Sequence, residues 1–225
     1  MSQLDFSILQ EWETISLLLQ GLKNTVIYTL IGFLLSLIIG VIIAFGQMSK
    51  VKSIRSIALV YLAWFRGTPL LVQLFLLYYG LPIIFGIETE AWVAGVLGLG
   101  MYSGSYVSQI VRGAIQSTEK GQMEAGRSLG FSHFQTMQKI ILPQATARML
   151  APLTNELISL SKNSSLLSSI TVLELFRQSN LLIANTYKTM EILFAVAITY
   201  FIINNIIGAI GLFLEKKTSF GGDLR

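Results

Sequence analysis

Long apolar runs dominate the sequence. Residues 26–45, 91–111 and 192–214 carry no charge, and Arg66 is the one charged residue in 57–85. A helix needs about 20 apolar residues to cross a hydrocarbon core of ~30 Å. The four runs are therefore predicted to span a membrane. Composition agrees, because charged residues make up 12% of the chain, against ~25% in soluble domains.

A fifth run, residues 149–173, contains Glu156 and Lys162 and is a weaker candidate. Basic residues gather in alternate loops, which indicates the cytoplasmic side. These residues are Lys50, Lys52, Arg55, Lys120, Arg127, Lys139, Lys216, Lys217 and Arg225, accompanied by the acids Glu119 and Glu124. The opposite loops carry Asp5, Glu11, Glu13, Glu88 and Glu90.

This pattern predicts an N-terminus outside the cell and a C-terminus in the cytoplasm, which requires an odd number of spans. We therefore expect an all-α polytopic membrane protein with five transmembrane helices, forming a single domain over residues 1–225. Residues 1–22 lack the basic start of a signal peptide. Their apolar residues recur at helical spacing, so they form either an amphipathic segment on the membrane surface or an early start of the first span.

Several function classes are excluded by residue counts. The chain has no cysteine, and His133 is its single histidine, which leaves no basis for a thiolate or histidine-rich metal site or a histidine-based catalytic group. Residues 121–128 approach a phosphate-binding loop, with Arg127 where lysine belongs. Because no strand precedes that segment, nucleotide binding there is rejected. The chain is not expected to be an enzyme or to bind nucleic acid.

The cytoplasmic loop 112–148 is too long for a simple connector. Its sequence predicts a short helix closed by Gly130 and a second one opened by a capping box of Ser132 and Gln135. Phe134, Met137 and Ile141 would form the apolar face of the second helix, and Pro143 would end the pattern before the next span.

Arg66, Glu156 and Lys162 would each cost ~2.5–3.5 kcal/mol facing lipid at a helix centre. They are therefore expected to face protein or water, as substrate groups or as a structural ion pair. Helix geometry places Asn155, Ser159 and Lys162 in one row, beside Glu156 and Asn163. This polar stripe offers partners for both the ammonium and the carboxylate of an amino acid.

The second span is predicted to break at Gly67 and Pro69. Broken helices expose backbone groups to transported substrates, so Thr68 and Gln73 are candidate substrate contacts, whereas Arg66 is assigned a structural or gating role. In the third span, Gly100, Gly104 and Ser108 are spaced for close helix packing.

The cytoplasmic loop resembles the coupling loop of ABC importer permeases. Glu124-Ala125-Gly126, then Gly130, then Ile140, Leu142 and Pro143, follow the spacing E-A-A-x3-G-x9-I-x-L-P, with Gly126 replacing an alanine. Arg66-Gly67-Thr68-Pro69 and the segment 155–166 are similar to R-G-T-P and N-x-x-I-x-L-x-K-[DN]-[ST]-S-L of the polar amino-acid permeases. The resemblance covers residues 17–214.

The resemblance implies a type I importer transmembrane domain in a bacterial cell membrane, whose coupling helix docks into an ATPase. It implies two ATPase subunits that bind ATP and Mg, a second identical or related permease subunit, and an extracellular binding protein. No cofactor is expected on this chain.

Offsetting charges of Glu156 and Lys162 favour a zwitterionic substrate such as glutamine or cystine. An ion-coupled secondary carrier is the alternative, although no internal repeat supports it. A membrane-embedded hydrolase is a second rival, which lacks a metal cluster or nucleophile–base pair.

Overall fold

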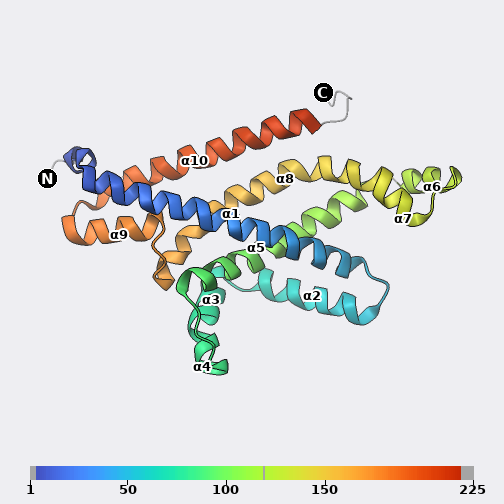
Figure 1. Cartoon of the computed structure of the whole chain (residues 1–225), viewed down its shortest axis with the longest axis horizontal. Coiled ribbons are helices and arrows are strands. Elements are labelled where there is room, and N and C mark those ends of the chain that lie inside the picture. The colour runs from blue at the N-terminus through green and yellow to red at the C-terminus, as the bar shows by residue number, and fades with distance from the viewer. Residues whose placement is uncertain (1–3, 119, 219–225) are drawn as a thin grey trace.

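The computed structural model describes residues 4–118 and 120–218, in which the regular elements are all helices (Figure 1). They are η1 (Phe6–Gln10), α1 (Trp12–Met48), α2 (Lys52–Gly67), α3 (Leu70–Phe75), η2 (Leu76–Gly80), α4 (Leu81–Phe85), α5 (Ala91–Gln116), α6 (Lys120–Ser128), α7 (His133–Thr136), η3 (Met137–Ile141), α8 (Leu142–Asn163), η4 (Ser164–Ile170), α9 (Leu175–Thr186) and α10 (Thr189–Thr218). Of the short elements, η1 and η4 are 3₁₀ turns, and η2 and η3 are π turns.

Helices α1 and α10 are each long and apolar enough to cross a membrane by themselves. They contain the predicted spans 26–45 and 192–214. The predicted span 57–85 is not one straight helix, because α2 and the α3–α4 segment pass the same test only as a pair bent by 108°. The structure thus shows an all-helical membrane protein with two or three clear spans among the described residues. The remaining predicted spans lie in α5 and α8. Small and charged residues lower the mean hydropathy of these two helices, and neither passes the same test.

Small residues bring α1 and α5 into close contact. A Cβ atom on Gly100 would lie 2.6 Å from Leu35 Cδ2, and one on Gly104 would lie 2.8 Å from Ile39 Cγ2. On α1, Gly40 likewise leaves no room for a side chain beside Val107. The packing role predicted for Gly100 and Gly104 is therefore confirmed.

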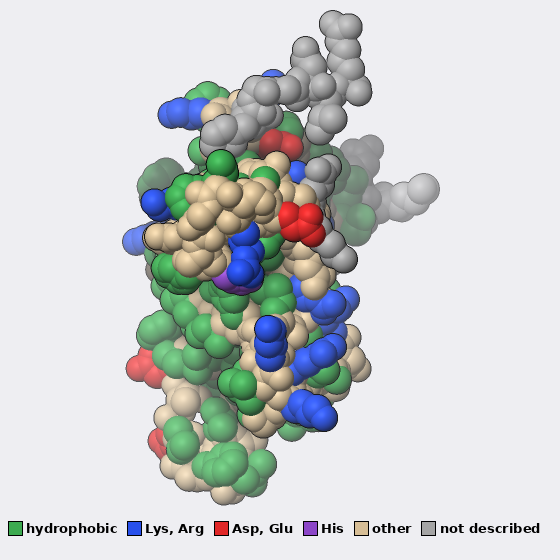
Figure 2. Space-filling model, turned by 90° about the vertical axis from the view of Figure 1, so that its right-hand side faces the viewer, with side chains coloured by type: hydrophobic (Ala, Val, Ile, Leu, Met, Phe, Trp, Pro, Cys, Tyr) green, Lys and Arg blue, Asp and Glu red, His purple; other side chains and the backbone are tan. Residues whose placement is uncertain are grey.

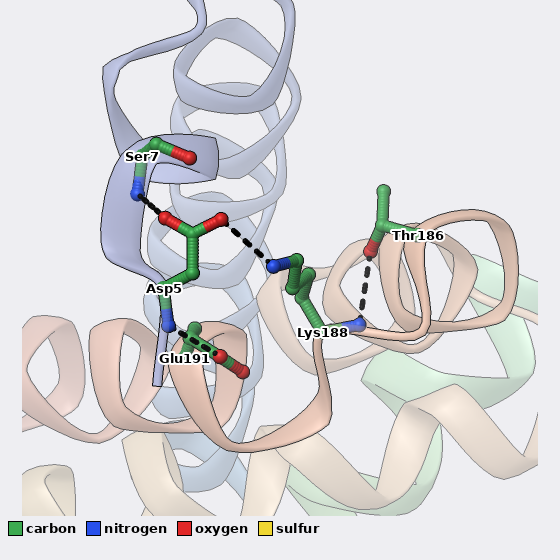
Figure 3. Close-up of polar contacts among 5 residues, drawn as sticks. All are labelled: Asp5, Ser7, Thr186, Lys188 and Glu191. Atoms are coloured by element: carbon green, nitrogen blue, oxygen red, sulfur yellow. Dashed lines mark hydrogen bonds and ion pairs between the residues drawn. The ribbon is translucent and has the colours of Figure 1, made fainter. Parts of the chain in front are cut away.

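The first predicted span extends without a break back to Trp12. Residues 12–22 thus belong to α1, and only η1 precedes it as a separate turn. Figure 3 shows how η1 is attached to the start of α10. Lys188 Nζ lies 2.9 Å from Asp5 Oδ2, and the Asp5 backbone N–H donates to Glu191 Oε1 at 3.0 Å. The bond from Lys188 holds the pKa of Asp5 well below its usual range.

One end of the molecule is basic. Figure 1 places α6, α7, the α1–α2 connection and the C-terminal end of α10 toward the same end of the molecule, and Figure 2 views that end, where Lys and Arg side chains gather. Exposed basic residues on these elements, on the start of α2 and on η3 are Lys50, Lys52, Arg55, Arg127, Lys139, Lys216 and Lys217. Residues Met1–Gln3, Glu119 and Arg225, which also entered the topology prediction, lie outside the described residues.

The loop after α5 follows the prediction up to Pro143. Gly130 has a φ of +84°, in the left-handed region, and Ser132 with Gln135 forms the capping box. The expectation that Pro143 ends the helical pattern is wrong, because helix continues from α7 through η3 into α8. Pro143 lies in the first turn of α8, directly after the π turn. A wider turn at this point accommodates the missing proline N–H.

Candidate functional site

A carboxylate held between two helices forms the centre of the candidate site. Glu156 of α8 is half-buried, and its Oε1 accepts a hydrogen bond from Ser103 Oγ of α5 at 2.7 Å. Ser103 is fully buried. The bond uses one carboxylate oxygen, so Glu156 retains acceptor capacity for a cationic group.

Aromatic side chains extend this site toward α2. The hydroxyl groups of Tyr102 and Tyr106, one turn apart on α5, lie 3.2 Å from each other. The guanidinium carbon of Arg66 lies 5.4 Å from the centre of the Tyr106 ring, within cation–π range. Helix α5 carries Ser103 and both tyrosines, so it contacts Glu156 of α8 through one residue and Arg66 of α2 through another. These residues, called the cluster below, include one positive and one negative group.

Sequence reasoning missed Ser103 and Tyr102 as members of this cluster. The sequence also assigned no role to Tyr106. The available signal was the i, i+4 spacing of the two tyrosines, which puts both on one face of a helix. Nothing in the sequence showed that Ser103 would point at Glu156, since that contact joins residues 53 positions apart.

The predicted polar stripe lies along α8 as a partly exposed row. Asn155 and Lys162 are exposed, whereas Ser159 and Asn163 are half-buried. The one ion pair found within the described residues joins Asp5 and Lys188. Glu156 therefore forms no ion pair with Lys162 or Arg66 in this part of the chain, and the alternative of a structural ion pair at Glu156 is not observed there. Glu156 and Lys162 are six positions apart on α8, so their side chains point about 120° away from each other around the helix axis.

The predicted break in the second span lies at Thr68 and Pro69. Thr68 is extended, with φ −122° and ψ 148°, as expected for a residue before proline. Gln73, 3% exposed, donates from Nε2 to the carbonyl oxygens of Phe65 and Thr68, both at 3.1 Å, and to Thr68 Oγ1 at 2.8 Å. The two predicted contacts therefore bind each other across the bend. Gln73 Oε1 is buried without a partner in the described structure and remains available to a donor.

The tip of the cytoplasmic loop is apolar and exposed. Leu129 and Phe134 are 75% and 73% exposed, and Glu124 and Ala125 beside them are also exposed. Of the predicted apolar face of the second helix, Ile141 is buried whereas Phe134 is exposed. The short turn between α6 and α7 directs Phe134 outward. Adjacent exposed large apolar side chains indicate a surface for another protein.

Gly126 is buried in the contact between α6 and α7. A Cβ atom there would lie 2.5 Å from Thr136 Cγ2, 2.9 Å from Thr136 Oγ1 and 3.2 Å from Ile140 Cδ1. Thr136 cannot easily move away, because it is fully buried and its hydroxyl donates to the Ser132 carbonyl at 3.0 Å. The glycine that departs from the family pattern is therefore explained by the internal packing of the loop.

Gly126→Ala is expected to destabilise the loop. The overpacking penalty of ~1–3 kcal/mol exceeds the gain of up to ~1 kcal/mol in helix propensity. Thr136→Ala in the same chain should recover much of the loss, which limited proteolysis of the loop in the single and double variants would measure. Thr136→Ala alone completes a double-mutant cycle with the unmodified chain and the other two variants. A more protease-resistant Gly126→Ala loop would contradict the packing role.

Residues 16–220 match the family described as "Binding-protein-dependent transport system inner membrane component". The chain is 38% identical to the "Probable amino-acid ABC transporter permease protein YckA" of Bacillus subtilis (strain 168) over 205 residues, 91% of this chain and 90% of that protein. It is 37% identical to the "Glutamine transport system permease protein GlnP" of Escherichia coli (strain K12) over 216 residues, 96% and 98% of the two chains. A solved structure described as "Crystal structure of an amino acid ABC transporter with histidines" has a TM-score of 0.90 and 35% identity, over 96% of this chain and 100% of that one.

Proposed function

Since the chain belongs to the family of binding-protein-dependent transport system inner membrane components, we propose that it forms the pathway by which an ABC importer takes up a polar amino acid. It is a non-catalytic transmembrane subunit. The observation that carries the proposal is the exposed tip of the α6–α7 loop, where Leu129 and Phe134 lie within the predicted coupling motif. A membrane subunit that relies on a separate ATPase needs such a surface, and related proteins over nine-tenths of the chain are named as amino-acid permeases.

The proposed assembly contains two ATPase subunits, which bind ATP and Mg, together with an extracellular binding protein and a second permease subunit. Exposed polar groups support the second permease. Arg66, Asn155 and Lys162 lie in predicted spans and are exposed in the single chain. Charged groups facing lipid are costly, so a partner subunit or a water-filled pathway must cover them. ATPase coupling is assigned to Glu124, Ala125, Gly126 and Gly130, of which Gly126 acts through loop packing.

The proposed topology has five spans in a bacterial inner membrane, with the N-terminus outside and the C-terminus in the cytoplasm. The basic end of the molecule supports this orientation (Figure 2). It contains both the α6–α7 loop and the C-terminal end of α10, as a cytoplasmic face requires. The attachment of η1 to the start of α10, away from the basic end, supports an N-terminus on the other side of the membrane.

A zwitterionic substrate suits the charges of the site, and glutamine is the leading candidate. Glu156 would bind the ammonium group of the substrate. Gln73 Oε1 and the hydroxyl groups of Tyr102 and Tyr106 would form hydrogen bonds with the polar side chain of the substrate. A cationic side chain would require a second acid, and burying it unpaired would cost several kcal/mol. The proposed substrate contacts are Glu156, Lys162, Asn163, Thr68, Gln73, Ser159 and Asn155, with Arg66, Gly67 and Pro69 in structural or gating roles.

Uptake into vesicles tests this proposal. The permease, purified with its ATPase and supplied with the cognate binding protein, should accumulate glutamine or cystine in an ATP-dependent manner, and arginine and glutamate should compete poorly. Loss of the ATPase during purification, or uptake driven by an ion gradient without ATP, would instead support the secondary carrier. Preference for arginine would refute the charge argument while leaving the importer intact.

A further inference from the structure

An apolar groove lies between α1, α8 and α10. These helices enclose a cavity of about 450 Å³, lined on α8 by Leu150, Leu153 and Leu157 and on α10 by Ile207, Ile210 and Leu214. Thr154 is also in the lining, but its hydroxyl donates to the Leu150 carbonyl at 2.9 Å and needs no further partner. The groove therefore offers no polar group to a ligand.

The helix arrangement explains why the groove exists. Figure 1 shows α1 and α10 close together at the N-terminal end and diverging toward the basic end, with α8 between them. Gly211 lets α10 approach α8 directly over Thr154, since a side chain at that position would collide with the threonine. The lining on α10 extends to Leu214, about one turn before the helix ends at Thr218.

The groove faces lipid rather than the polar side of α8. Asn155 and Lys162, which need water or another subunit, lie more than a quarter-turn away from Leu150, Leu153 and Leu157 at ~100° per residue. A partner that covers those polar residues does not also cover the groove. Within the hydrocarbon core, the available material for an apolar groove is an acyl chain.

A positive charge lies where the groove reaches the basic end. Lys217 follows Leu214 by three residues and continues the face of α10 formed by Ile210 and Leu214. Lys216 is adjacent, both lysines are exposed, and within the described part of the chain neither pairs with a carboxylate. Glu215, which precedes them, is half-buried. An anionic headgroup at this depth would complement the lysines.

We propose that the groove between α1, α8 and α10 binds one acyl chain of an anionic phospholipid of the cytoplasmic leaflet, with Lys217 at its headgroup. The site is distinct from the cluster around Glu156 and does not depend on which amino acid is transported. It predicts that the chain retains phosphatidylglycerol in preference to a zwitterionic lipid with the same acyl chains.

Native mass spectrometry of the purified full-length permease complex tests the site. The probes are palmitoyl-oleoyl phosphatidylglycerol and palmitoyl-oleoyl phosphatidylcholine. Lys217→Gln should weaken phosphatidylglycerol retention about fivefold and leave phosphatidylcholine unchanged. Lys52→Gln, an exposed lysine at the same end but on α2, is the matched control and should change neither. Leu153→Trp, which fills the groove, should reduce retention of both lipids.

Equal retention of the two lipids by the unmodified chain would overturn the proposal. So would an equal loss in Lys52→Gln and Lys217→Gln, which would indicate general attraction to a basic surface. If Leu153→Trp instead separated the two permease subunits without changing lipid retention, a second copy would be the occupant. Lys217→Gln is an exposed substitution, so its result does not depend on the folding of the groove-filling variant.

Discussion

Glu156→Gln is expected to abolish amino-acid uptake while basal ATP hydrolysis continues. Glutamine preserves the shape of the side chain and can still accept from Ser103, but it removes the negative charge offered to the substrate ammonium. Removing one partner of a buried charged pair costs about 2–5 kcal/mol, or roughly 30-fold to several thousand-fold in affinity. Substrate-stimulated ATP hydrolysis and uptake should therefore fall together, as measured in vesicles with the complete importer.

Two further variants separate substrate binding from structure. Glu13→Gln removes a carboxylate near the start of α1, far along the chain from the cluster, and should leave uptake at the unmodified rate. Ser103→Ala removes the hydrogen bond but retains the charge, so uptake should be weakened and not abolished. Wild-type uptake by Glu156→Gln would show that the carboxylate only joins α5 to α8.

Glu124→Lys is expected to stop uptake by uncoupling the permease from its ATPase. Glu124 is exposed on α6, beside the apolar tip formed by Leu129 and Phe134. Reversing its charge leaves the buried Gly126–Thr136 contact intact, so the permease should still fold. Reversal of a charge at an interface places like charges together, which costs several kcal/mol. Less ATPase should therefore copurify with the variant.

Glu88→Lys is the matched control, because it makes the same reversal at an exposed residue on the opposite predicted side of the membrane. It should retain the ATPase fully. Normal ATPase recovery and uptake in Glu124→Lys would remove Glu124 from the coupling surface and leave Leu129 and Phe134 as its candidates.

Local rules predicted the features that short segments determine. The left-handed Gly130, the Ser132–Gln135 capping box and the break at Pro69 each depend on neighbouring residues, and all three are present. Apolar runs located the helices for the same reason. The five-span count remains a prediction. Small or charged residues lower the mean hydropathy of α5 and α8, so neither helix passes the length-and-composition test for a membrane span.

Contacts between distant residues could not be read from the sequence. Ser103 meets Glu156 only because α5 packs on α8, and the glycine at position 126 is explained only by Thr136. Pro143 does not end the helix, because the π turn just before it accommodates a residue without an N–H. The sequence does not reveal that π turn. The outward position of Phe134 depends on how α7 is placed against α6.

The bend between α2 and α3 has a consequence for movement. One amide, that of Gln73, closes the chain across the corner with three hydrogen bonds, to Phe65 and to two oxygen atoms of Thr68. Straightening or tightening the corner would break these bonds inside the protein, where replacements are scarce. The corner is therefore a rigid bracket and not a joint. When the importer alternates between its outward- and inward-open states, α2 and α3 should travel as one piece, and the change of shape must arise where helices slide past each other.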